Sequence, residues 1–316
     1  MKKKKSLIFG INGQDGAYLA KTLLKKKYSI YGITRNKNYR NLKKLNLLNK
    51  IRLFNFSSFD NPKIMNLLKK NFDEIYFLAG QSSVKDSFNK ITLTYESQIL
   101  PLKNILDYIV KQNGKKTKFL YAGSSEIFGN VNKQKKINED SFKRPVSPYG
   151  MSKLIGYEII KSYRTMFKIP VCTAILFNHE SPLRLKSFVF KKIIDNVKKI
   201  KKNSKNKLRI GNINIKRDWG WGPEYMTGCH KIINSKKIDD YIIATGKTVS
   251  LKKIIELSFK SVNLNWKKYT VIEKRNFRKF EIKENYSNIS KLKKKIKWTP
   301  KIGYLEVIKR LFEKEL

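Results

Sequence analysis

In the stretch SLIFGINGQDGAYLAKTLL, residues 6–24, a strand pattern, three glycines and a helical pattern follow one another directly. Residues 6–10 form an apolar run typical of a buried strand, and the residues from 17 onward repeat apolar side chains at helical spacing. Between the two lie Gly10, Gly13 and Gly16. Glycine is needed where a backbone turns tightly and approaches a pyrophosphate, and the N-terminus of the following helix offers free N–H donors. The stretch therefore predicts a dinucleotide site built from a strand, a turn and a helix.

The same alternation of strand and helix continues along the chain. Further apolar runs that indicate strands lie at residues 28–34, 51–56, 74–80, 118–123 and 171–177, and helical patterns lie at 61–70, 92–112 and 148–167. Continuously apolar strands separated by helices are typical of a parallel sheet covered on both faces. We predict an α/β fold with a doubly wound parallel sheet, the Rossmann arrangement.

The regular alternation of strand and helix patterns ends after Phe177. A lysine-rich helix is predicted at 187–202 and a short strand at 208–211, whereas residues 241–246 and a helix at 250–262 are expected to return to the sheet. We therefore expect a Rossmann domain of residues 1–177 plus about 239–262. A smaller, mixed and discontinuous C-terminal domain is expected to contain about 178–238 plus 263–316.

The composition narrows the range of partners. The net charge is +46, which suggests nucleic acid, but only 11 of the 70 basic residues are arginine and the lysines are spread over nearly every segment. This distribution favours a generally basic surface over a nucleic-acid site. Cys172 and Cys229 cannot form a disulfide framework, and the few Cys and His residues predict no metal site. The apolar run behind MKKKK is too short for a signal peptide or a membrane span, so a soluble, cytoplasmic protein is expected.

The segment after the second predicted strand bears on the choice of cofactor. An acidic residue at this place would bind the ribose 2′-hydroxyl of NAD. The sequence there is ITRNKNYR, residues 33–40, which contains no carboxylate and places Arg35 where a 2′-phosphate would lie. The segment favours NADP, with NAD as the less favoured alternative.

Tyr149 and Lys153 form the candidate catalytic pair. They are four residues apart on a predicted helix that Ser147 can cap and Pro148 can start. A neighbouring ammonium is expected to lower the pKa of the phenol and make it a usable base. The spacing also occurs at Tyr39 and Tyr157, but only Tyr149 follows a hydroxyl-rich strand end by one loop.

That constellation resembles the extended short-chain dehydrogenase/reductases and, within them, the GDP-mannose 4,6-dehydratases. The resemblance runs from about residue 6 to 312. Its most specific motifs are ILFNHESP and RDWG. The other motifs are GINGQDGAYLA, FDEIYFLAGQSSV, SSEIFG, SPYGMSK, GNINIKRDWG, IATG, RNFR and KWTP.

The resemblance implies a hydro-lyase that converts GDP-D-mannose, or a related GDP-hexose or GDP-heptose, to a GDP-4-keto-6-deoxy sugar and water by internal hydride transfer through bound NADP. It implies that Tyr149 deprotonates the 4-hydroxyl while Lys153 holds the phenolate and the nicotinamide ribose. Ser124 and Ser125 would stabilise the enolate oxygen. Glu126 would take the C5 proton and protonate the departing C6 hydroxyl, which explains a carboxylate beside the serines.

The resemblance also implies which residues bind the two ligands. The candidate cofactor residues are Gly10, Asn12, Gly13, Gln14, Asp15, Gly16, Arg35, Leu78, Ala79, Gly80, Ser82, Lys153, His179 and Arg184. The candidate residues for the GDP-sugar are Asn178, Lys192, Arg217, Arg278 and Glu281. The chain departs from the family pattern at Phe56, Ser83, Leu93 and Ser124.

Two alternatives remain open at this stage. One is a reductase or epimerase that acts on the GDP-4-keto-6-deoxy sugar, which would not need Glu126. The other is a basic nucleic-acid-binding or scaffold protein on a degenerate enzyme fold. The segment at 36–46 further suggests a homo-oligomer, a dimer or a tetramer, because family members reach a neighbouring subunit there.

Overall fold

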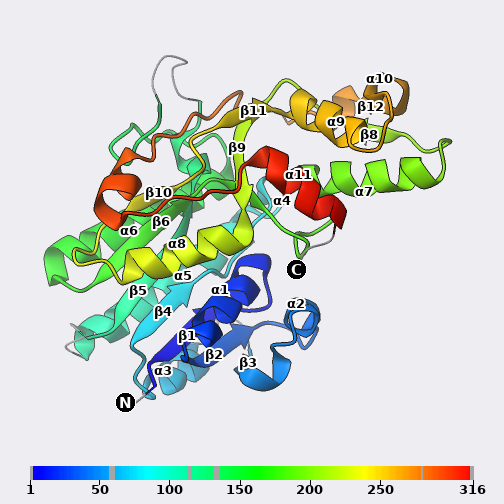
Figure 1. The fold of residues 1–316 in the computed structure, drawn as a ribbon. Helices are drawn as coiled ribbons and strands as arrows, with labels where there is room; N and C mark the ends of the chain where they lie inside the picture. Colours follow the sequence, from blue (N-terminus) through cyan, green and yellow to red (C-terminus); the bar gives the residue numbers. More distant parts are fainter. Residues whose placement is uncertain (1–2, 57–60, 113–115, 131–135, 279, 314–316) are drawn as a thin grey trace.

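The computed structural model in Figure 1 describes residues 3–56, 61–112, 116–130, 136–278 and 280–313. Within this part of the chain, none of the helices combines the length and the apolar composition needed to cross a bilayer.

A seven-stranded sheet forms the centre of the molecule. Every neighbouring pair of strands in it is parallel, in the order β10-β6-β5-β4-β1-β2-β3. The predicted parallel sheet is therefore confirmed, including the return of the chain at β10. The strands are β1 (Lys5–Phe9), β2 (Ser29–Thr34), β3 (Arg52–Asn55), β4 (Glu74–Phe77), β5 (Lys118–Ser124), β6 (Val171–Leu176) and β10 (Tyr241–Ile243).

Helices cover both faces of this sheet, as its apolar strands require. Side chains alternate along β1, so that Ile8 packs with one set of helices while Leu7 and Phe9 pack with the other. The first set is α1 (Gln14–Lys25), α2 (Arg40–Lys44) and α8 (Gly222–Ile233). The second set is α3 (Asn61–Leu68), α5 (Ile91–Lys111) and α6 (Pro148–Phe167). The short helices α4 (Val84–Ser87), η1 (Leu48–Lys50) and η2 (Ser125–Phe128) lie in the connections.

A second hydrophobic core lies beyond the carboxyl ends of the strands. Three amphipathic helices, α7 (Val189–Lys202), α9 (Leu251–Lys260) and α11 (Tyr304–Glu313), surround it and gather on the side of the molecule away from the N-terminus (Figure 1). Two small sheets complete this part. They contain β7 (Asn178–Glu180), β9 (Lys216–Trp221) and β11 (Thr248–Ser250), and β8 (Leu208–Ile210) and β12 (Thr270–Ile272). The remaining elements are α10 (Trp266–Tyr269), η3 (Lys274–Asn276) and η4 (Leu292–Ile296).

Two helices pack differently from the expected division of the chain. The helix α8 packs on α1 and the central sheet, although its residues were expected in the smaller domain. The helix α9 packs against α7 and α11 in the second core, although residues 250–262 were expected with the sheet. Apolar periodicity predicts that a helix forms but not which core receives its apolar face. We propose that α8 belongs to the sheet domain and α9 to the smaller domain.

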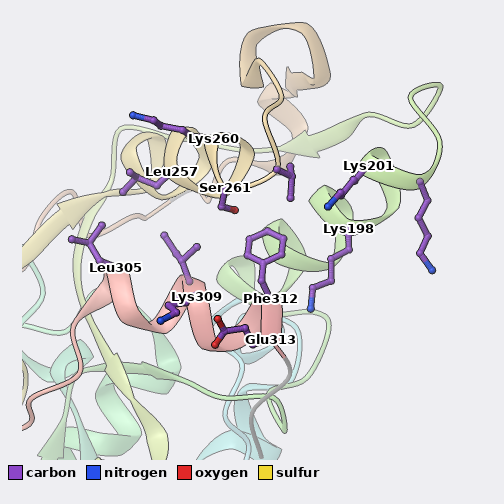
Figure 2. Close-up of a pocket in the computed structure, with 12 residues that line it drawn as sticks. Lys198, Lys201, Leu257, Lys260, Ser261, Leu305, Lys309, Phe312 and Glu313 are labelled. Atoms are coloured by element: carbon purple, nitrogen blue, oxygen red, sulfur yellow. The ribbon is translucent and has the colours of Figure 1, made fainter.

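The three helices of the smaller domain also enclose a surface groove of about 1020 Å³. Figure 2 shows Leu257, Leu305 and Phe312 along it and Lys201 and Lys260 at its rim. This groove shares no lining residue with the cavity that contains the candidate site.

Candidate functional site

A cavity of about 730 Å³ lies where the carboxyl ends of the parallel strands face the smaller domain. Most of the candidate residues line it. From the cofactor set these are Asp15, Leu78, Ala79, Gly80, Ser82, Lys153, His179 and Arg184. From the catalytic and substrate sets they are Ser124, Ser125, Glu126, Tyr149, Asn178, Lys192, Arg217, Arg278 and Glu281. Six cofactor candidates do not line this cavity: Gly10, Asn12, Gly13, Gln14, Gly16 and Arg35.

The glycine-rich turn brings the backbone close to the start of α1. Gly10 has a φ of +79°, and a Cβ atom on Gly16 would lie 2.3 Å from the Gly10 carbonyl oxygen. The Gly13 N–H donates to that same carbonyl oxygen at 3.0 Å. Larger residues at Gly10 and Gly16 would open the turn, so these two glycines are required by the packing of the backbone itself.

The N-terminus of α1 has the features expected of a pyrophosphate site. Gly13 precedes the helix and provides no side-chain cap for its first N–H groups. The Asn12 Oδ1 atom is buried and has no hydrogen-bond partner among the described residues. These free donors and this free acceptor fit a nicotinamide dinucleotide. Arg35 is exposed and follows the last residue of β2 directly.

The catalytic candidates come from the end of β5 and the start of α6. The strand β5 ends at Ser124, whose hydroxyl accepts a hydrogen bond from the Glu126 N–H at 3.3 Å as η2 begins. The helix α6 begins as predicted, with the Ser147 hydroxyl accepting from the Gly150 N–H at 3.0 Å. Its first turn therefore presents Tyr149 to the same cavity as Ser124 and Glu126.

The expected lowering of the Tyr149 pKa is wrong for this structure. Burial raises the pKa of Tyr149 to about 12, although a hydrogen bond with Ser124 opposes the rise. Burial also lowers the pKa of Lys153 to about 7, so the ammonium carries only part of its charge at neutral pH. The Lys153 Nζ atom donates to the Ala122 carbonyl oxygen at 2.8 Å and lies 5.9 Å from the centre of the Tyr149 ring. Sequence spacing placed these groups together but did not reveal how deeply both are buried.

A buried ion pair joins the glycine-rich turn to the smaller domain. The His179 Nε2 atom lies 2.9 Å from Asp15 Oδ1, and its Nδ1 atom lies 2.7 Å from the Phe177 carbonyl oxygen. The His179 ring therefore lies between the Asp15 carboxylate and a backbone carbonyl oxygen. The Ser181 hydroxyl donates to Gln14 Oε1 at 2.7 Å and strengthens the same junction.

The substrate candidates gather basic groups on the opposite wall. Arg217 is 4% exposed, and burial lowers its pKa while Glu126 and Glu281 raise it and Arg278 lowers it further. The Arg278 Nε atom lies 3.9 Å from Glu281 Oε1. Two guanidinium groups therefore line the same cavity as Glu281, and two guanidinium groups are suited to a diphosphate. Lys192 donates from its Nζ atom to the Arg209 carbonyl oxygen at 2.7 Å, and Asn178 begins β7.

A sequence model of the family described as GDP-mannose 4,6 dehydratase matches residues 7–311 of this chain. The chain belongs to the GDP-mannose 4,6 dehydratase family. This match confirms the resemblance expected from the motifs.

Individual members of this family are similar over nearly their whole length. The chain is 33% identical to GDP-mannose 4,6 dehydratase 1 of Arabidopsis thaliana, covering 99% of this chain and 90% of the plant protein. It is 33% identical to the Drosophila melanogaster GDP-mannose 4,6 dehydratase, covering 99% and 86%. It is 31% identical to the Homo sapiens protein of that name, covering 97% and 90%.

Solved structures of related enzymes share the fold. A UDP-glucuronic acid 4-epimerase from Bacillus cereus, solved with UDP-glucuronic acid and NAD, superposes with a TM-score of 0.86 at 21% identity over 98% of both chains. A dTDP-glucose 4,6-dehydratase from Bacillus anthracis, solved with NAD, gives 0.84 at 16% identity over 98% of this chain and 96% of that chain. The chain therefore shares its fold with both of these proteins.

In this member of the dehydratase family, the cavity is also lined by Glu180, which is not among the candidate residues. Glu180 is 2% exposed and lines the cavity, and burial raises its pKa. Its Oε2 atom lies 3.7 Å from Arg184 Nε, and neither atom has a hydrogen-bond partner among the described residues. Glu180 directly follows His179 in the motif ILFNHESP, so its position in that motif was the available signal.

The departures from the dehydratase family pattern fall in different places. Ser83 lines the cavity, and its hydroxyl caps α4 by accepting from the Asp86 N–H at 3.2 Å. Phe56 packs edge-on against Phe54, with ring centres 6.4 Å apart, and Leu93 is 36% exposed on α5. Neither Phe56 nor Leu93 lines the cavity. No group of His, Cys, Asp and Glu residues in the described part of the chain could hold a metal ion.

Proposed function

We propose that this protein is a GDP-sugar 4,6-dehydratase, a hydro-lyase that converts GDP-D-mannose or a closely related GDP-hexose or GDP-heptose to the GDP-4-keto-6-deoxy sugar and water. The observation that carries the proposal is a single cavity lined by Glu126 and Tyr149 and also by Arg217 and Arg278. A diphosphate held by the two arginines leaves the sugar to extend toward the carboxylate and the phenol.

We assign one task to each catalytic side chain. Tyr149 takes the proton of the sugar 4-hydroxyl, and Lys153 and Ser124 hold the phenolate oxygen and the developing oxyanion. Glu126 takes the proton from C5, which the 4-ketone has made acidic, and delivers a proton to the departing C6 hydroxyl. Water leaves, and a proton finally returns to C5. An epimerase or reductase would have no use for the Glu126 carboxylate, so this residue favours the dehydratase.

We propose NADP as the cofactor rather than NAD. When bound, NADP supplies the redox chemistry, accepting the C4 hydrogen with its electron pair and returning it to C6. The support is Arg35, exposed directly after β2, in a segment of residues 33–40 that has no carboxylate. The residues that would hold the dinucleotide are the glycines at 10, 13 and 16, with Asn12, Gln14, Asp15, Leu78, Ala79, Gly80, Ser82, Lys153, His179 and Arg184.

Two further properties belong to the proposal. We propose that the enzyme acts in the cytoplasm, because Cys172 and Cys229 are both free and buried. We also propose a homo-oligomer, a dimer or a tetramer, in which the segment at 36–46 reaches a neighbouring subunit.

The test is to incubate the purified protein with GDP-mannose and NADP⁺ and to follow product mass together with the absorbance of reduced nicotinamide. Loss of one water per sugar, with no accumulation of reduced cofactor, is expected. Accumulation of reduced cofactor with no loss of water would contradict the dehydratase assignment.

A further inference from the structure

Asp218 lies directly after Arg217 on β9 but has no place in the cavity. Arg217 lines the cavity, whereas Asp218 is fully buried and does not line it. Successive side chains of a strand point to opposite faces, so this arrangement follows from the strand itself. Asp218 therefore acts on the site only through the backbone and its own partners.

Those partners belong to two other segments. Asp218 Oδ1 accepts hydrogen bonds from the Thr245 N–H at 3.0 Å and from the Thr245 hydroxyl at 2.7 Å. Asp218 Oδ2 accepts from the Gly246 N–H at 2.7 Å and from the Ser287 hydroxyl at 2.8 Å. Both carboxylate oxygens thus have two donors, and the side chain ties β9 to the turn after β10 and to Ser287.

The segment that contains Ser287 also supplies the rest of the basic wall. It runs beside β9, where the Lys216 N–H donates to the Lys283 carbonyl oxygen at 2.8 Å and the Asn285 N–H donates to the Lys216 carbonyl oxygen at 3.2 Å. Glu281, in the same segment, lines the cavity, and its Oε1 atom lies 3.9 Å from Nε of Arg278, which also lines it. Asp218 therefore holds β9, the strand that carries Arg217, against Ser287 in the segment that follows Arg278.

Such a fixture is needed because the two guanidinium groups repel each other. Arg278 lowers the pKa of Arg217, which shows that the two charges interact unfavourably. Glu126 and Glu281 offset part of this repulsion, and the hydrogen bonds of Asp218 hold the backbone of β9 in place beside Arg217. An asparagine could not replace the carboxylate, because its NH₂ group would face donors.

We propose that Asp218 is a positioning residue for binding of the substrate diphosphate, holding Arg217 and Arg278 at the spacing that a nucleoside diphosphate requires. The inference rests on the proposed function, which assigns the diphosphate to these arginines. It adds a residue that touches neither substrate nor cofactor.

The test compares Asp218→Asn with Asp240→Asn. Asp240 is also a buried carboxylate, 3% exposed, and it accepts hydrogen bonds from Arg164 and from the Thr173 N–H, but it does not line the cavity. Both variants should lose stability. Only Asp218→Asn should weaken the binding of GDP, measured by calorimetry, by about tenfold, with KM for GDP-mannose raised similarly and kcat within about threefold of wild type.

A double-mutant cycle identifies the route of the effect. If Asp218 acts through Arg217, then Asp218→Asn should change GDP affinity little further when Arg217→Lys is already present. Ser287→Ala, which removes one donor only, should shift GDP affinity in the same direction by a smaller factor and serves if Asp218→Asn fails to fold.

Equal GDP affinities for wild type, Asp218→Asn and Ser287→Ala, or fully additive effects in the cycle, would overturn the inference. A wild-type protein that binds GDP but leaves GDP-mannose unchanged would instead contradict the proposed function. In that case the GDP affinities of the variants still decide the role of Asp218.

Discussion

His179 Nε2 lies 2.9 Å from Asp15 Oδ1, so β7 is joined to the first turn of α1. Burial alone would raise the pKa of Asp15, but the ion pair and hydrogen bond with His179 hold it well below its usual range. The pair therefore contributes stability at the junction of the glycine-rich turn and the smaller domain.

Asp15→Asn should reduce the free energy of unfolding by about 2 kcal/mol at pH 7, because it removes the carboxylate that lies 2.9 Å from His179 Nε2. The measure is urea unfolding. Asp195→Asn is the matched control, since Asp15 and Asp195 side chains are both 24% exposed and Asp195 pairs with Lys191 at 2.6 Å. The free energy of unfolding should fall less in the control, because the Lys191 side chain can turn to solvent. Equal losses in the two variants would argue against a special role for the Asp15–His179 pair.

Glu126→Gln should lower the rate of water loss by roughly 10²- to 10⁴-fold, because the amide can neither take the C5 proton nor protonate the C6 hydroxyl. The product is measured by mass, and exchange of the C5 hydrogen is followed in deuterated water. Glu281→Gln changes a second carboxylate of the same cavity and should mainly raise KM. Turnover of Glu126→Gln within about tenfold of wild type would refute the role given to Glu126.

Arg35→Ser should weaken NADP binding by about 10- to 100-fold and leave NAD binding nearly unchanged, since a charge-assisted contact to the 2′-phosphate is lost. Fluorescence titration with each reduced dinucleotide gives both affinities. Lys37→Ser removes a charge two residues away that is also exposed. It should change the affinities for NADP and NAD weakly and to the same extent. Parallel changes in NADP and NAD affinity for Arg35→Ser would rule out discrimination by this residue.

Glu74 should give the protein a pH-dependent share of its stability. It is 1% exposed on β4, and its carboxylate accepts hydrogen bonds from Tyr28, Tyr76 and Asn234. Although burial raises its pKa, His230, whose Nδ1 atom lies 3.7 Å from Glu74 Oε2, and the hydrogen bonds from these three groups lower the pKa to about 2. The stability is therefore present above the ordinary value of 4.5 and is lost as the pH falls toward 2.

Glu74→Gln should cost roughly 3 kcal/mol at pH 7, and the difference from wild type should narrow as the pH drops below about 4.5. Urea unfolding between pH 7 and pH 3 measures both effects. Glu96→Gln, on the exposed part of α5, is the control and should follow wild type throughout. A difference between Glu74→Gln and wild type that stays constant over this pH range would show that the charge of Glu74 is not the cause.

The central sheet was predictable because its information is local. Continuous apolar strands, the glycines after β1 and the Ser147–Pro148 start of α6 are each encoded within a few neighbouring residues. The elements themselves were placed to within a few residues. The packing of α8 and α9 was not predictable in this way. The sequence of an amphipathic helix indicates that it has an apolar face but not which core that face packs against.

Part of the candidate site was also predictable from local sequence, and part was not. Tyr149 and Lys153 share one helix, and Ser124 and Glu126 share one strand end, so local spacing relates them to each other. Glu126, Arg217 and Arg278 meet only in the folded chain. The support that Asp218 gives to this wall depends on Thr245, Gly246 and Ser287, which no local pattern connects to it.

The alternation of strands and helices up to Phe177, the glycine-rich turn, the candidate catalytic residues and the family all follow from the sequence alone. Only the tertiary structure decided the electrostatic state of the site. Burial sets the pKa of Tyr149 at about 12 and that of Lys153 at about 7, against an expectation drawn from their spacing. The physical reason is that the free energy of a charge depends on the solvent and partners around it, and these are supplied by segments far apart in the chain.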